Sequence, residues 1–398
     1  MDEQKSVDQK ETQDVNTQSM DATEVNPEEK KPKRKMKVWQ IILLVLLVIV
    51  VAGIGVIAAY INKLNNNIQR PDENYAEQII TNETPEPATE AAVETEATAT
   101  PKPQDETRDI VLYGVDARNT SLGKGNRSDC IIIAHINETK KQIKLVSVYR
   151  DTYANIPDHG YQKITHAYAF GDAMLSMSTL NINYDLNLKE FVTVNFAVLE
   201  DIINELGGVE IDVQPEEVRY VNGYVHSLYK ESGINELSYI SGSGLQTLNG
   251  SQAVAYCRIR YTAGGDMKRA ERQRLVLSKI MEKAKTMKVK TLMNIAESAS
   301  KKVYTSLKLK DILGLVSEVY DYEIVESEGF PYHYATGLVS GASVVKPISY
   351  LEDVTTLHRD VYGESDYQPS KKVKSIAEDL AWMQESVTTE DPGRYFDE

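Results

Sequence analysis

The chain has 398 residues and a formal net charge of −15, with 41% hydrophobic and 26% charged side chains. This acidic balance opposes a general nucleic-acid binder, which needs a broad basic surface, so nucleic acid is not expected among the partners. With only two cysteines, the composition also excludes a disulfide scaffold, and it fits neither a collagen nor a coiled coil.

The first 61 residues predict a cytoplasmic tail and a membrane anchor. Residues 1–29 hold nine acidic and two basic residues without hydrophobic periodicity, which is typical of disorder. Residues 30–37 hold six basic residues, and Val38–Ile61 follows as an uncharged apolar run whose helix would span ~36 Å. By the positive-inside rule, the basic cluster keeps residues 1–37 in the cytoplasm and orients 38–61 as a single-pass signal anchor of the plasma membrane. A cleaved signal peptide fits less well, because the apolar run is too long and no clear cleavage site follows it.

Residues 62–108 predict an extracytoplasmic stalk. They contain ten acidic and four basic residues, and 81–106 consist mostly of Thr, Glu, Pro and Ala. Such a composition cannot bury a core, so we expect the segment to be disordered and to lift a folded domain off the membrane.

Residues 109–385 carry the pattern of one globular α/β domain. Three short runs rich in β-branched residues predict buried strands at Asp109–Tyr113, Cys130–Ile136 and Ile143–Val148. Later segments predict a helix from Asn195 to Leu206, a strand at Val209–Val213, a helix over 268–288, and two last helices near 350–361 and 373–384. Alternating strands and helices favour a three-layer α/β fold, and residues 386–398 are expected to form a frayed tail.

Charged residues gather where the predicted strands begin and end, which is where binding residues are usually displayed. Asp116 and Arg118 follow the first strand, Arg127 and Asp129 precede the second, and Arg150 and Asp151 close the third. Two carboxylates with few other ligands suit Mg²⁺ or Mn²⁺, which take the rest of their coordination shell from water and phosphate. Capping of turns is the alternative interpretation of Asp116 and Asp129.

A second group of basic residues lies within 250–310, where there are fifteen bases and four acids. Arg258 and Arg260 are two apart in an apparent strand, so both should point to one face. Arg269, Arg272 and Gln273 are three and four apart in a helix and should share a face as well. Guanidinium groups donate paired, permanently charged hydrogen bonds that suit phosphate oxygens. These side chains therefore favour a metal-assisted pyrophosphate site, while the many lysines that follow are expected to form a solvated surface.

Other chemistries find little support. The chain has no GxxxxGK[ST] phosphate loop and no GxSxG nucleophile elbow, and its six histidines lack the spacing of metal ligands. Cys130 and Cys257 each adjoin a candidate site residue, and strand alternation would turn both thiols away from the site. A disulfide is chemically allowed outside the cell, but buried apolar thiols are the favoured interpretation.

Seven motifs stand in order between Asp109 and Gln384: LYGVDAR, NRSDC, SVYRDTYANIP, KITHAYAFGD, INELGGVEIDV, LNGSQAVAYCRIR and GGDMKRAERQR. In this combination they resemble the LytR-CpsA-Psr family. The resemblance implies an α-β-α sandwich with a central mixed sheet behind one transmembrane helix. It also implies an enzyme on the outer face of the membrane. This phosphotransferase would move a glycopolymer, such as teichoic acid or capsule, from a polyprenyl-pyrophosphate carrier in the membrane lipid to peptidoglycan.

The resemblance extends to individual site residues. The family's metal-binding aspartates match Asp116 and Asp129. Its pyrophosphate-binding residues match Arg150, Arg258, Arg260 and Arg269, with Arg272 and Gln273 completing the part carried by a helix. Arg118 and Arg127 complete the candidate pyrophosphate-binding set, and Asp151 and Asp266 are its supporting carboxylates. Catalysis is expected from Asp116, as the acceptor of the hydroxyl proton, and from Arg150, Arg258 and Arg260.

Four positions depart from the family pattern. Tyr149 stands where proline is usual and Asp172 where glycine is frequent. Cys130 replaces a threonine, and Cys257 replaces a small aliphatic residue. None of these changes removes a charged candidate residue.

Two other functions stay open on the sequence alone. One is an envelope lipid-sensing regulator or transcriptional attenuator, although the expected topology opposes direct action on DNA. The other is a polyprenyl-pyrophosphate hydrolase, because the same site would serve when water is the acceptor.

Overall fold

The computed structural model describes residues 68–82, 105–117, 121–232, 237–339 and 341–383. The expected cytoplasmic tail 1–37, membrane anchor 38–61 and frayed end 386–398 lie outside these residues. Among the helices in the described ranges, none is both long enough and apolar enough to cross a membrane.

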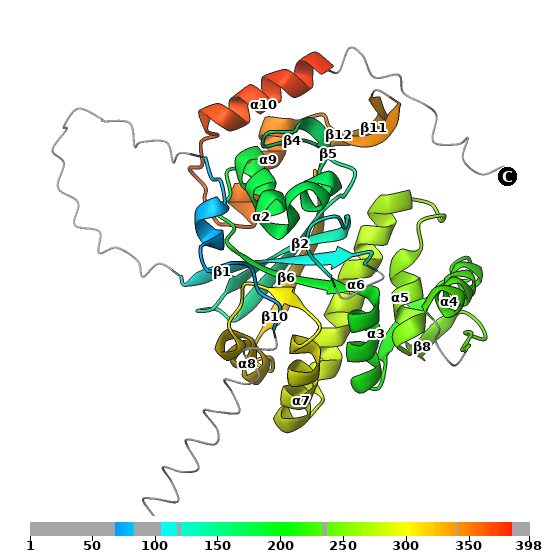
Figure 1. Cartoon of the computed structure of the whole chain (residues 1–398). Helices are drawn as coiled ribbons and strands as arrows, with labels where there is room; N and C mark the ends of the chain where they lie inside the picture. The colour runs from blue at the N-terminus through cyan, green and yellow to red at the C-terminus, as the bar shows by residue number, and fades with distance from the viewer. Residues whose placement is uncertain (1–67, 83–104, 118–120, 233–236, 340, 384–398) are drawn as a thin grey trace, which may run out of the picture. The chain divides into compact units, whose positions relative to one another are not determined.

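A six-stranded mixed sheet forms the centre of the fold (Figure 1). Its strands, from one edge to the other, are β10 (Glu323–Phe330), β3 (Gln142–Val148), β2 (Ser128–Asn137), β1 (Thr107–Val115), β6 (Glu190–Asn195) and β9 (Tyr304–Thr305). β1 runs parallel to β6, and β10 runs parallel to β3, while the other neighbours are antiparallel. The three strands predicted first in the chain are all present, and the expected mixed α/β fold is confirmed.

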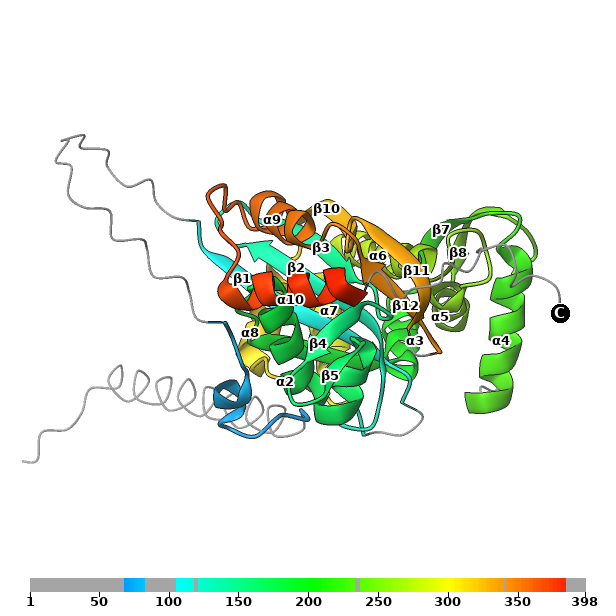
Figure 2. The same ribbon diagram turned by 90° about the horizontal axis from the view of Figure 1, so that it is seen from above.

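Helices cover both faces of this sheet and make three layers (Figures 1 and 2). One face packs against α2 (Thr165–Tyr184), α9 (Tyr350–Asp360) and α10 (Lys371–Trp382). The other face is covered by α3 (Phe196–Glu205), α6 (Gly265–Lys285), α7 (Val289–Ser300) and α8 (Leu309–Ser317). Side chains on a strand alternate between faces, so Val111 and Tyr113 of β1 point toward α2, whereas Ile110 and Leu112 point toward the second helix layer.

The face under α2 holds the largest core of the domain. Tyr113, Met177 and Phe191 are completely or almost completely buried there, and each such side chain contributes roughly 1.5–3 kcal/mol relative to an exposed position. α2 bends at Gly171 and Asp172, where the helical backbone angles are interrupted. Asp172 has φ 55° and accepts a hydrogen bond from the Met174 amide at 3.0 Å. A positive φ at this position explains physically why glycine is frequent here in the family pattern.

A smaller lobe stands beside the main sheet and carries its own core. The predicted strand β7 (Val209–Val213) pairs there with β8 (Gly244–Leu248), and α4 (Val218–Ser232) and α5 (Gly250–Arg258) pack against the pair. Two hairpins, β4 (Tyr153–Ile156) with β5 (Gly160–Lys163) and β11 (Tyr334–Val339) with β12 (Ala342–Pro347), complete the strands.

The segment from Tyr256 to Arg260 is not a strand, and the prediction for it was wrong. α5 begins at a capping box in which Asn249 and Gln252 bond each other's backbone amides, and it continues to Arg258. Ile259, which follows the helix, is extended, with φ −61° and ψ 122°. The apolar alternation that suggested a strand comes from a buried helix end, which periodicity cannot distinguish over so few residues.

Residues 68–82 correct the expected stalk, because they pack on the folded body. Gln69 pairs with Tyr304 of the edge strand β9, and a short helix, η1 (Tyr75–Gln78), leads to Ile79, which is buried in the core under α2. The side chain of Asn82 donates a hydrogen bond to the carbonyl of Ile182 at 2.9 Å. The low-complexity composition that suggested a stalk belongs to the residues after this segment.

Candidate active site

A charged cavity of about 630 Å³ opens where β1 and β6 end and α6 begins. It is lined by Asp116, Gly125, Asn126, Arg127, Asp129, Arg150, Phe196, Tyr224, Cys257, Arg258, Arg260, Arg269 and Gln273. Five arginines against two aspartates leave an excess of positive charge, so the cavity is suited to an anion. Most of the candidate site residues, which are far apart in the sequence, therefore meet at one place.

Arg150 lies at the centre of the carboxylates around this cavity. It follows β3, and its Nη1 donates to Asp129 Oδ1 at 2.6 Å while Nη2 donates to Asp266 Oδ2 at 3.3 Å. Its Nε is 3.7 Å from Asp151 Oδ2. Burial opposes the charge on Arg150, but these three carboxylates outweigh that effect and raise its pKa. The guanidinium is thus fixed in place with its charge retained.

Two supporting carboxylates, Asp151 and Asp266, lie in contact with each other behind the cavity wall. Burial and a hydrogen bond to Asp266 raise the pKa of Asp151, whose Oδ1 is also 3.1 Å from Lys163 Nζ. Burial opposes ionisation of Asp266 too, but Arg269 and Arg150 outweigh it and lower the pKa of that carboxyl. The two arginines therefore favour the charged form of Asp266, whereas burial opposes the charged form of Asp151.

Arg269 and Gln273 reach the cavity from the first turns of α6. They are four residues apart and share one face of the helix. Arg269 is buried, with Nη1 at 3.4 Å from Asp266 Oδ1 and Nη2 donating to the carbonyl of Asp129 at 3.3 Å. The positive end of the helix dipole also points here, because α6 begins at Gly265.

The connection between β1 and β2 brings Asp116 and Arg127 to the cavity, and both residues are exposed. Near its end, the side chain of Asn126 donates hydrogen bonds to the carbonyls of Ser121 and Gly123 at 2.9 and 2.8 Å. Arg118 lies outside the described residues. Arg127 therefore lines the cavity, and a role in binding stays a prediction for both arginines.

Arg258 and Arg260 both line the cavity although no strand carries them. Arg258 ends α5 with its guanidinium over the rings of Phe196 and Tyr224, at 5.1 and 5.3 Å from their centroids. Arg260 is exposed and donates to the hydroxyl of Tyr261 at 2.7 Å. The aromatic neighbours Phe196 and Tyr224 were missed by the sequence reasoning, because no motif marks them.

Arg272 does not line the cavity and forms a buried ion pair instead. Its Nε donates to Glu217 Oε1 at 2.7 Å, and each side chain is 3% exposed. It also donates to the carbonyl of Ile259 and to Thr262 Oγ1. Arg272 therefore braces the segment that carries Arg260, rather than offering its charge to a ligand.

The two cysteines are free thiols at the boundary of the site. Cys257 lines the charged cavity, contrary to the expected alternation, because it sits in a helix and not in a strand. Cys130 packs beside Ile132 and Leu277. Burial raises the pKa of the Cys130 thiol to about 12, and it raises that of Cys257 as well. Cys257 is thus a buried free thiol and Cys130 a partly buried one.

The donor set of the cavity suits a magnesium ion that binds together with phosphate. Asp116 and Asp129 line the same cavity, and Asp116 is exposed to it. Within the described ranges, no group of three or more His, Cys, Asp or Glu side chains forms a closed metal cage. Two carboxylates fit Mg²⁺ that keeps water and phosphate oxygens as its other ligands.

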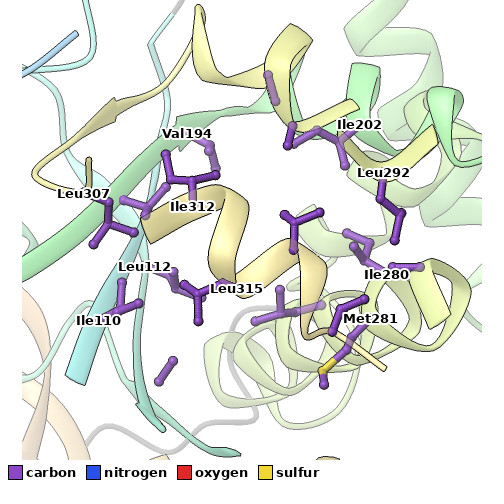
Figure 3. A pocket seen from close by; sticks show the side chains of 18 of the residues that line it. Ile110, Leu112, Val194, Ile202, Ile280, Met281, Leu292, Leu307, Ile312 and Leu315 are labelled. Carbon is purple, nitrogen blue, oxygen red and sulfur yellow. The ribbon is translucent and has the colours of Figure 1, made fainter. Parts of the chain in front are cut away.

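A second, apolar cavity of about 440 Å³ lies between the sheet and the helices α3, α6, α7 and α8. Side chains from the sheet and from these helices point toward one another around it (Figure 3). Ile110, Leu112 and Val194 form its sheet wall, and Ile280 and Leu315 belong to its helix walls. The helices α7 and α8 add walls that the amphipathic spacing of Leu292, Ile295 and Ala299 could have indicated.

The two cavities approach each other along shared elements. Val194 lines the apolar cavity, and Phe196, two residues later, lines the charged one. On α6, Gln273 lines the charged cavity and Leu277, one turn later, lines the apolar one. One molecule with a charged part and a long apolar part can therefore contact both.

Comparison with known proteins identifies the family. The LytR_cpsA_psr family model matches residues 74–357. The chain belongs to the LytR_cpsA_psr family. The polyisoprenyl-teichoic acid–peptidoglycan teichoic acid transferase TagT of Bacillus subtilis is 30% identical over 319 residues, which cover 78% of this chain and 92% of TagT.

A second relative and a solved structure are also similar to this chain. The polyisoprenyl-teichoic acid–peptidoglycan teichoic acid transferase TagU of Enterococcus faecalis is 33% identical over 206 residues, 51% of this chain and 62% of TagU. The solved structure of TagT bound to LI-WTA superposes with a TM-score of 0.52 at 28% identity, covering 66% of this chain and 91% of that one.

Proposed function

We propose that this protein transfers a teichoic acid-like glycopolymer from a polyprenyl-pyrophosphate carrier to peptidoglycan. The observation that carries the proposal is that an arginine-lined cavity and an apolar cavity are lined by successive turns of the same helix, α6. The charged cavity suits the pyrophosphate, and the apolar cavity suits the polyprenyl chain. The transferase names of relatives that are at least 30% identical support the same substrate class.

The reaction would be a phosphoryl transfer. A hydroxyl of a peptidoglycan sugar attacks the phosphorus on the sugar side of the pyrophosphate, the new P–O bond forms, and the bond to the bridging oxygen breaks. The polymer phosphate stays with peptidoglycan, and polyprenyl phosphate leaves. Arg150, Arg258, Arg260 and Arg269 stabilise the charge that develops on the phosphate oxygens, which is usually the largest contribution to catalysis. Asp116, exposed at the cavity, accepts the hydroxyl proton.

Magnesium or manganese would be held by Asp116 and Asp129. Bound there, the ion would supply positive charge that neutralises the phosphate oxygens, so that they repel the attacking hydroxyl less. Arg150 keeps Asp129 oriented toward the cavity, through their 2.6 Å contact.

The expected location is the outer face of the plasma membrane, with residues 38–61 as the anchor. Both the lipid carrier and peptidoglycan are then within reach of the folded domain. This topology also opposes a direct role in transcription.

The decisive test is the double substitution Arg258→Ala with Arg260→Ala. Removing two guanidinium groups from the charged cavity should lower polymer transfer to peptidoglycan at least about 100-fold, measured with a labelled lipid-linked donor and mass analysis of the product. Arg359→Ala is the matched control, because that arginine is exposed on α9, on the other side of the sheet. Wild-type transfer by the double variant would contradict the site, and release of polymer into water without attachment would identify a hydrolase.

A further inference from the structure

The helix α6 sets the order in which the parts of a carrier can lie. Its 21 residues extend over ~31 Å. Arg269 and Gln273, near its beginning, line the charged cavity, while Leu277, Ile280 and Met281, further along, line the apolar one. A molecule of the order sugar–pyrophosphate–lipid, with its lipid toward the end of α6, must therefore place its sugar near the beginning of this helix.

Two tyrosines are presented at that end of the site. Tyr261 lies four residues before α6, is 47% exposed, and has its ring centroid 6.4 Å from that of Tyr220, the rings being inclined by 32°. Tyr220 comes from the first turn of α4 and is partly buried against the core of the lobe. The two rings thus form a short aromatic surface outside the charged cavity.

Arginines connect this surface with the cavity and hold its rings. Arg260 lines the charged cavity, donates to the Tyr261 hydroxyl at 2.7 Å, and lies 4.9 Å from the centre of that ring. On the far side, Arg219 donates to the Tyr220 hydroxyl at 2.6 Å and lies 4.5 Å from its ring centre. Arg260, Tyr261, Tyr220 and Arg219 therefore form a continuous row of contacts from the charged cavity to the protein surface.

Such a row matches the chemistry of a sugar ring. A pyranose has an apolar C–H face that packs on an aromatic ring, and hydroxyl groups at its rim that accept hydrogen bonds from guanidinium groups. We propose that Tyr261 and Tyr220, with Arg219 at their outer edge, bind the first sugars of the donor polymer next to the pyrophosphate. The proposal rests on the function proposed above and adds a sugar subsite to it.

The test compares two donors that differ only in the sugar. Geranylgeranyl pyrophosphate and geranylgeranyl-diphospho-N-acetylglucosamine are titrated into the full chain in detergent, and the two dissociation constants are measured. Tyr261→Ala should weaken binding of the sugar-bearing donor on the order of tenfold and leave the sugar-free donor unchanged. Tyr261→Phe, which keeps the ring, should retain most of the affinity for the sugar.

Tyr229→Ala is the control, because Tyr229 is also on α4 and is 39% exposed but lies outside this row; it should change neither constant. Equal weakening of both donors by Tyr261→Ala would overturn the subsite and leave Tyr261 as a support for Arg260. Unchanged binding of both donors would overturn it as well. A wild-type chain that binds neither donor would instead contradict the proposed function.

Discussion

Arg269 and Arg272 are three residues apart on α6, yet their environments differ completely. Arg269 faces the charged cavity, whereas Arg272 is paired with Glu217 in the interior. An α-helix turns by about 100° per residue, so Arg272 points in a clearly different direction from its neighbour Gln273, which lines the charged cavity together with Arg269. Charge alone therefore does not make an arginine a ligand of this site; its angle on the helix decides.

Removing one partner of the buried pair should destabilise the domain severely. Arg272→Ala leaves Glu217 charged and unpaired in the interior, so we expect the free energy of unfolding to fall by about 3–5 kcal/mol, measured by urea denaturation. Replacing both residues, Arg272→Met with Glu217→Leu, should cost much less, because no unpaired charge remains. A double variant as unstable as the single one would contradict this explanation.

The residue types of the site could be predicted from the sequence, but their roles only in part. Asp116, Asp129, Arg150 and Arg269 come together as their motifs indicate. Arg272 differs because its partner, Glu217, lies 55 positions away in the sequence. A contact between residues so far apart in the sequence cannot be inferred from the spacing of residues within one motif.

At the scale of elements, the helix α3 connects the sheet to the site through its N-cap residue. Asn195 ends β6, and its Oδ1 accepts the amide of Val198 at 3.0 Å, which caps α3. Its Nδ2 donates to the carbonyl of Ala117 at 3.2 Å, next to Asp116. One side chain thus fixes both a helix start and the loop that carries a candidate metal ligand.

Asn195→Ala should therefore affect both stability and activity. We expect a loss of about 1 kcal/mol in the free energy of unfolding from the missing cap, together with slower polymer transfer because the Asp116 loop is released. Ser370→Ala is the matched control, since Ser370 caps α10 through the Val373 amide on the other helix layer. That variant should lose similar stability and keep its transfer rate; equal rates for both variants would contradict the role of Asn195.

The elements with strong periodicity, such as the first three strands, α3 and α6, could be predicted from the sequence. Their arrangement could not. β10 pairs with β3 through Glu323 and Gln142, and β1 pairs with β6 through Ile110 and Glu190, which are contacts between distant segments. The end of α5, from Tyr256 to Arg258, was mistaken for part of a strand because so short a buried segment does not reveal the helical period.

At the scale of the whole molecule, residues 68–82 join the two helix layers across the edge of the sheet. Ile68 packs with Leu309 of α8 on one side, and Ile79 enters the core under α2 on the other. Between them, Gln69 pairs with Tyr304 and covers part of the edge strand β9. The match of the family model from residue 74 agrees that the folded unit includes part of this segment.

Adjacent isoleucines test whether this segment stabilises the domain. Ile79→Ala should lower the free energy of unfolding by about 2–4 kcal/mol, because its side chain leaves a cavity in the main core. Ile80→Ala should cost less than about 0.5 kcal/mol, because Ile80 is 47% exposed. Thermal unfolding of the two variants gives the comparison, and equal melting temperatures would show that the segment contributes little.

The course of α6 past both cavities has a consequence for how the gene can vary. Substitutions between Gln273 and Leu277 change single side chains, whereas one inserted codon would rotate everything after it by about 100°. The apolar lining would then turn away from the sheet while Arg269 stayed in place. Natural variation in this stretch should therefore consist of replacements at constant length, with insertions and deletions confined to the loops on either side of the helix.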